Sequence, residues 1–105
     1  YQQLKSSPSS MSTIHAALAE QVIGSNKSEG EALQHALDNE DLKAMERIAH
    51  KLKGTAYMLN HSGLLEQCIE VEELCADGMM SINTLEAVTT LMQSLEAINQ
   101  ALRPS

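Results

Sequence analysis

The residues LKAMERIAHKLKGTAYMLN, at positions 42–60, decide the fold of this 105-residue chain. Apolar side chains recur there in alternating steps of three and four, at Leu42, Met45, Ala49, Leu52, Ala56 and Leu59. This spacing places them on one side of an α-helix about five turns long. Asn39 and Asp41 supply start signals, and Asn60, a residue that tolerates the left-handed conformation, follows the last apolar residue. The stretch predicts a helix with one buried and one exposed side.

Two segments after this helix repeat its pattern. The first ends at Asp77-Gly78 and has its apolar residues at Leu64, Cys68, Val71 and Cys75. The second is preceded by Ser81 as an N-cap and has its apolar residues at Leu85, Val88, Met92, Leu95, Ile98 and Leu102. The two cysteines lie on one side of a helix rather than in a CxxC pair, and we interpret them as reduced core thiols.

The segment before the predicted helix over residues 42–59 is less regular. Its apolar residues are Ile14, Leu18, Val22 and Ile23, then Leu33, Ala36 and Leu37. Between these two groups stand Gly24-Ser25-Asn26 and a pair, Ser28 and Glu31, with the spacing of a capping box. Either two helices or one helix with a weak point fits this pattern, and the sequence does not decide between them.

Short connections between helices of this length make neighbouring helices antiparallel. We therefore predict an all-α fold, an antiparallel up-down four-helix bundle, with an extra N-terminal helix as an open alternative. The prolines at positions 8 and 104 leave everything between them free to be helical. Residues 1–10, with their Ser/Pro stretch, are predicted to be a flexible linker, and residues 11–105 a single domain.

The composition excludes several classes of function. Fourteen acidic residues against seven basic ones give a net charge of −7, which offers no general support for binding nucleic acid. No apolar run is long enough for a membrane span, and no His, Cys, Asp and Glu set has the spacing of a zinc site. We expect His15, His35 and His61 to be surface or boundary residues.

His50 lies opposite the apolar side of the helix over residues 42–59. On a helical wheel it projects about 130° from the direction of the apolar residues, so it faces solvent. Lys53 and Gly54 follow it at i+3 and i+4, which stacks a cation and a patch without a side chain beside the imidazole. A glycine inside a helix costs about 1 kcal/mol relative to alanine, and steric room next to His50 is a local reason for it. With Lys43, Arg47 and Lys51, this helix holds four of the seven basic residues.

The residues AHKLKGTA, at positions 49–56, closely resemble the A-H-x-L-K-G-[ST]-[AS] signature of histidine-containing phosphotransfer (HPt) domains. The resemblance extends over about residues 13–102, through the residues Leu33, Ala36, Leu37 and Asp41 upstream and Leu64, Cys68, Val71 and Glu72 downstream. It implies a phosphorelay intermediate of two-component signalling. His50 would accept a phosphoryl group from a receiver-domain phospho-aspartate and pass it to the aspartate of a response regulator.

The resemblance also assigns roles to the residues around His50. Lys53 would stabilise the charge of the phosphoryl group, Lys51 would act as a flanking cation, and Gly54 would leave steric room. Glu72 matches a position whose polar residue can orient the histidine across the bundle. Docking of the receiver is expected to involve the exposed residues Glu46, Arg47 and Tyr57.

No glycine loop of an ATP site and no set of Mg²⁺-binding carboxylates occurs in the chain. We therefore expect a module that is not an autonomous enzyme and has no cofactor of its own. The resemblance implies that the partner receiver supplies the Mg²⁺. We expect a monomeric domain without direct membrane contact. The linker-like start suggests the C-terminal module of a hybrid sensor histidine kinase, with a free-standing relay protein as the open alternative. The resemblance implies that such a kinase is anchored in a membrane with this module in the cytoplasm.

Two rival interpretations remain. The dimerisation helix of a sensor histidine kinase also presents an exposed histidine, but its usual H-E-[LIV]-[RK]-T-P box would require an acid in place of Lys51 and a proline in place of Thr55. The other rival is a structural adaptor bundle in which His50 is never phosphorylated.

Overall fold

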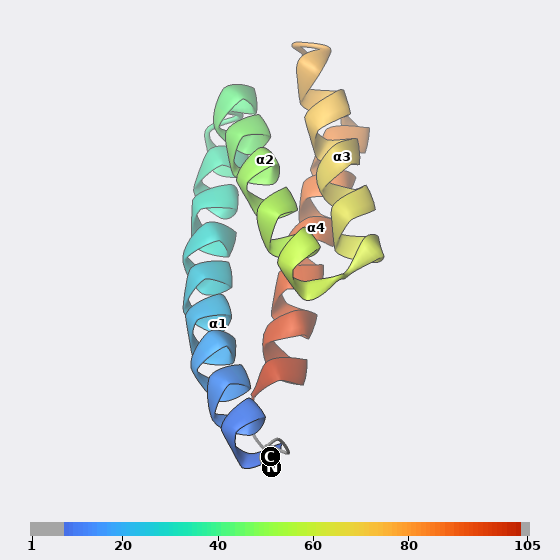
Figure 1. Ribbon diagram of the computed structural model, residues 1–105. Coiled ribbons are helices and arrows are strands. Elements are labelled where there is room, and N and C mark those ends of the chain that lie inside the picture. The colour runs from blue at the N-terminus through green and yellow to red at the C-terminus, as the bar shows by residue number, and fades with distance from the viewer. Residues whose placement is uncertain (1–7, 104–105) are drawn as a thin grey trace.

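The computed structural model describes residues 8–103, and side chains from residue 16 onward. Four helices follow one another along the chain: α1 (Pro8–Asp38), α2 (Leu42–Leu59), α3 (Ser62–Ala76) and α4 (Ile82–Leu102). They run alternately up and down and pack side by side (Figure 1). This confirms the predicted all-α, antiparallel four-helix bundle. Of the linker predicted for residues 1–10, residues 1–7 lie outside the described residues, whereas residues 8–10 belong to the start of α1 and correct the predicted boundary.

Helix α1 settles the alternative that the sequence left open, because it is one continuous helix through Gly24 and Ser28. The Ser28–Glu31 pair therefore begins no helix. The buried side of α1 continues across the gap between its two apolar groups through five positions, namely Val22, Asn26, Glu29, Leu33 and Ala36. Two of these core positions carry polar residues, which is why the apolar pattern is interrupted in the sequence.

The helix ends are fixed by local hydrogen bonds. Asp41 accepts one from the Ala44 N–H at the start of α2, and Asn60 ends that helix in the left-handed conformation, with φ 54°. Both were predicted, as was the N-cap of α4, where Ser81 Oγ accepts from the Thr84 N–H at 3.2 Å. Asn39, predicted as a start signal for α2, instead donates to the His35 carbonyl oxygen at the end of α1.

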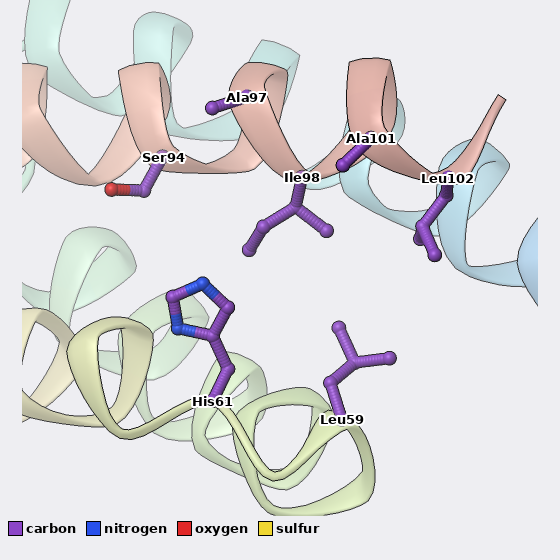
Figure 2. Close-up of a pocket in the computed structure, with 7 residues that line it drawn as sticks. All are labelled: Leu59, His61, Ser94, Ala97, Ile98, Ala101 and Leu102. Carbon is purple, nitrogen blue, oxygen red and sulfur yellow. The ribbon is translucent and has the colours of Figure 1, made fainter.

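His61 has a role that the sequence analysis missed. Its Nδ1 accepts a hydrogen bond from the Leu64 N–H at 3.0 Å and so caps α3. The ring also faces a hollow beside α4 (Figure 2). Since the connection from α2 to α3 is only Asn60–His61, this cap directs the chain into the helix that carries Glu72.

The core is aliphatic and draws on all four helices. Its largest fully buried side chains include Leu33, Met45, Leu52, Leu64 and Leu91. Cys68 and Cys75 are free and buried, as expected of core thiols, and burial raises the pKa of both to about 11.

One part of the predicted apolar stripe of α4 is wrong. Leu85 is exposed, whereas Thr84, Ala87 and Leu91 are buried. Helix α4 packs against both α1 and α3. Its buried face is therefore wider than the single stripe that one apolar residue every three or four positions would give.

Helices α1 and α4 extend beyond the turn between α2 and α3 (Figure 1). The molecule is accordingly elongated, with a longest dimension of 58 Å. Two hollows lie where the four-helix region becomes two helices. One is lined by Leu59, His61, Ser94, Ala97, Ile98, Ala101 and Leu102 (Figure 2), and the other by Leu18, Ala19, Val22, Met58, Leu59 and Leu102.

Candidate functional site

His50 lies in the middle of α2 on the side that faces away from the core. Its neighbours in the chain, Ile48 and Ala49, point into the bundle and are buried, which fixes the orientation of the helix. The His50 side chain is 73% exposed. The rigid helix therefore presents an imidazole to anything that approaches this face.

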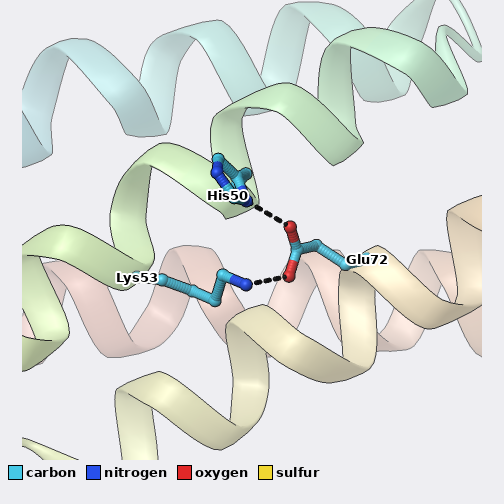
Figure 3. Close-up of polar contacts among 3 residues, drawn as sticks. All are labelled: His50, Lys53 and Glu72. Atoms are coloured by element: carbon cyan, nitrogen blue, oxygen red, sulfur yellow. Dashed lines mark hydrogen bonds and ion pairs between the residues drawn. The ribbon is translucent and has the colours of Figure 1, made fainter.

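Glu72 reaches His50 from the neighbouring helix α3. Its Oε2 atom lies 2.9 Å from His50 Nδ1, and its other oxygen, Oε1, lies 2.9 Å from Lys53 Nζ (Figure 3). A carboxylate can only accept hydrogen bonds, so the neutral imidazole carries its proton on Nδ1. The lone pair then resides on Nε2, the nitrogen that makes no hydrogen bond within the part of the chain that the structure describes.

Within the group formed by His50, Lys53 and Glu72, each charged side chain stabilises the charge of the other. Burial alone would raise the pKa of the Glu72 carboxyl, but the hydrogen bonds from Lys53 and His50 outweigh it, and the net pKa lies below the ordinary value. The hydrogen bond to Glu72 raises the pKa of Lys53. At neutral pH, therefore, a carboxylate and an ammonium ion stand together beside the imidazole.

Lys51 points to the opposite side of α2. Its Nζ lies 2.7 Å from Oε2 of Glu29, a buried residue of α1. The two lysines that follow His50 are thus held by carboxylates from two different helices. Sequence reasoning missed Glu29, because its position on the buried side of α1 becomes evident only once its partner Lys51 is known.

Gly54 lies on the exposed surface one turn after His50. A Cβ atom placed there would meet nothing within 4 Å. No contact inside the described chain therefore requires this glycine, so steric room at this position can matter only for an approaching partner.

The surface around His50 combines charged and apolar groups. Of the residues expected to contribute to docking, Arg47 and Tyr57 are exposed and Glu46 is half-buried. Two apolar residues that the sequence analysis did not include, Leu18 on α1 and Met58 on α2, are also exposed at the hollow between these helices.

Other kinds of site find no support in the described residues. There, no three or more His, Cys, Asp and Glu side chains gather in a way that could hold a metal ion. None of the described helices combines the length and the apolar character needed to cross a membrane. His35 is exposed as predicted, and the side chain of His15 lies outside the described side chains.

The comparison with protein families agrees with this geometry. The family model for the Hpt domain matches residues 4–103, nearly the whole chain. The chain therefore belongs to the Hpt domain family, whose members are phosphotransfer modules of two-component signalling that interact with response-regulator receiver domains. Comparisons with curated proteins and with solved structures found no significant match.

Proposed function

We propose that His50 is the phosphoryl acceptor and donor of this domain, taking the group from a receiver phospho-aspartate and passing it to a second receiver. The observation that carries this proposal is the shared carboxylate of Glu72. It holds the proton of the imidazole on Nδ1 and keeps Lys53 within reach of the same site.

The chemistry follows from this arrangement. The Nε2 lone pair attacks phosphorus, the N–P bond forms, and the bond between phosphorus and the aspartate oxygen breaks, leaving the receiver carboxylate as an anion. The Nδ1 proton stays on the ring, where the hydrogen bond to Glu72 stabilises the positive charge that develops on the imidazole. Lys53 offers its ammonium to the equatorial phosphoryl oxygens, over which charge is spread in the transition state. The reverse sequence returns the group to an aspartate.

We infer that the receiver supplies the Mg²⁺ ion that the transfer requires. The residues on this side of the interface then need only present the nucleophile and one or two cations. A parent hybrid sensor kinase anchored in a membrane, with this module in the cytoplasm, remains the prediction for the wider context.

We further propose that the receiver docks over the exposed face of α2 and the adjoining face of α1. A standard interface covers about 800 Å² on each partner, a disc of roughly 16 Å radius. Met58 lies eight residues after His50, about 12 Å along the helix axis. A receiver whose aspartate reaches His50 can therefore also cover the exposed residue Met58, with Arg47 and Glu46 at the opposite side of the footprint. Leu18 lines the same hollow as Met58 and would belong to the same contact.

A transfer experiment tests the central assignment. The domain is incubated with a receiver domain that carries a labelled phosphoryl group, and we expect an acid-labile, alkali-stable label that disappears in the His50→Gln variant. The His35→Gln variant removes another exposed imidazole and should retain the label. If the His50→Gln variant kept the label, the assignment would be wrong and a structural adaptor would become the better explanation.

A further inference from the structure

Glu29 is the only charged residue that is buried among those the structure describes. Its side chain is 12% exposed and occupies a core-facing position of α1. A carboxylate at such a position costs folding free energy unless it is paired. An apolar residue there would serve the core better, so its presence calls for a reason other than packing.

The partner of Glu29 lies in the candidate site. The Oε2 atom of Glu29 is 2.7 Å from Nζ of Lys51, the residue directly after His50. The Lys51 side chain is itself 71% exposed, so solvent could accommodate its ammonium in many positions. The ion pair selects one of these, against α1.

The two sides of α2 have a matching arrangement. Glu72 from α3 pairs with Lys53, and Glu29 from α1 pairs with Lys51. The two lysines within three residues of His50 are thus each paired with a carboxylate, and the charges of the two pairs sum to zero. A site built only to attract a phosphoryl group would leave both cations free.

Electrostatic energies explain why a relay domain benefits when the lysines near its histidine are neutralised by carboxylates. A phosphoryl group carries nearly two negative charges at neutral pH. A free ammonium at roughly 6 Å through water would favour the phosphorylated state by about tenfold in an equilibrium constant. Such a preference would hinder the second half of the relay, in which His50 must give the group away.

We propose that Glu29 is a positioning residue that holds the Lys51 ammonium against α1 and thereby keeps phosphorylated His50 close in free energy to the phosphorylated receiver. This inference rests on the proposed function of His50. The role proposed for Glu29 changes no bond in the transfer described above. It concerns only the equilibrium between the phosphorylated domain and the phosphorylated receiver.

The test is the equilibrium ratio of phosphorylated domain to phosphorylated receiver, measured with the Glu29→Gln variant and a receiver that phosphorylates the wild type. We expect the ratio to shift toward phosphohistidine by about three- to tenfold at low ionic strength, and the shift to shrink in concentrated salt. The Glu31→Gln variant removes the same charge from an exposed position of α1 and should leave the ratio unchanged. Thermal unfolding followed by circular dichroism verifies that each variant is folded.

A comparison in the Lys51→Gln variant separates positioning of Lys51 by Glu29 from a direct effect of the Glu29 charge on His50. If Glu29 acts through Lys51, the Glu29→Gln substitution should leave the ratio unchanged when Lys51 is already replaced by Gln. An equal shift in both backgrounds, or an unchanged ratio in the single variant, would overturn the proposal. Absence of any label on His50 of the wild type would instead contradict the proposed function itself.

Discussion

At the scale of single residues, the carboxylate of Glu72 contacts two other side chains of the candidate site at once. One oxygen faces His50 and the other faces Lys53, so the imidazole and the ammonium are oriented by the same group. The consequence is that these three side chains should respond to mutation as a unit rather than independently.

Replacing Lys53 by Ala tests its part in this unit. The substitution removes the ammonium expected to stabilise the phosphoryl oxygens, and we expect transfer from a receiver to slow by about 10- to 100-fold. Rapid-quench measurements of the transfer rate provide the readout. Helicity in circular dichroism should stay intact, and Lys43→Ala, an exposed cation on the same helix, should transfer at the wild-type rate. An unaltered rate in the Lys53 variant would remove this lysine from the mechanism.

The pH dependence of stability tests the Glu72 contacts. Because the folded-state pKa of Glu72 lies below its unfolded value, these contacts stabilise the fold fully above the unfolded pKa of about 4.3 and less as the pH falls through the folded pKa. Urea unfolding should show the wild type more stable than Glu72→Gln at pH 7, with the difference shrinking below about pH 4. The same substitution at the exposed residue Glu86 serves as the control. A difference that grew on acidification would contradict the ion pairs.

At the scale of helices, α1 is the element that the sequence described least well. Its core positions include Asn26 and Glu29, whose partners lie on other helices: Asn99 on α4 and Lys51 on α2. A buried polar residue is indistinguishable from a loop residue in a sequence pattern when the partner that satisfies it is not yet known. This explains why the continuity of α1 could not be predicted.

Substitution of Gly24 tests that continuity. In an uninterrupted helix with open space around this position, Gly24→Ala should stabilise the fold by about 0.5–1 kcal/mol, because alanine restricts the unfolded chain and a Cβ here meets nothing within 4 Å. Chemical denaturation measures the change. Gly78→Ala provides the contrast, since its φ of +79° should make the same change destabilising. A loss of stability at Gly24 would indicate a break in α1.

Helices α2 and α3 were predictable because their signals are local. The apolar positions of α2, its Asp41 cap and the left-handed Asn60 can all be recognised within 20 residues of sequence. The exposure of His50 and the placement of Lys53 follow from that helix alone. The His61 cap was missed because histidine is not among the usual N-cap residues, and the width of the buried face of α4 depends on two packing neighbours.

At the scale of the whole molecule, the few basic residues of an acidic chain are concentrated on one helix. Four of its seven Lys and Arg residues lie on α2, while the net charge is −7. The exposed apolar residues Leu18 and Met58 lie toward the end of the bundle where α1 and α4 project beyond the other two helices (Figure 1). The exposed residue Ile82, at the start of α4, lies at the opposite end. The two ends can therefore be tested separately as docking surfaces.

Charged substitutions at each end provide that test. Met58→Glu should raise the KM for a phosphorylated receiver by about tenfold, because it places a charge in the proposed apolar contact. Ile82→Glu should leave the KM unchanged. Labelling of His50 by phosphoramidate, a small donor that needs no docking, should proceed equally in both variants. Equal KM values for the two variants would show that the receiver does not cover Met58.

The hydrogen bond between Glu72 and Nδ1 also determines which chemical isomer the relay would carry. Phosphorylation at Nε2 yields tele-phosphohistidine, whereas attack through Nδ1 would yield the pros isomer and would require the imidazole to leave the carboxylate first. Isomer-specific antibodies distinguish the two products. The wild-type domain should contain only the tele form, so a contact between two helices would define which ring nitrogen is phosphorylated as well as which residue.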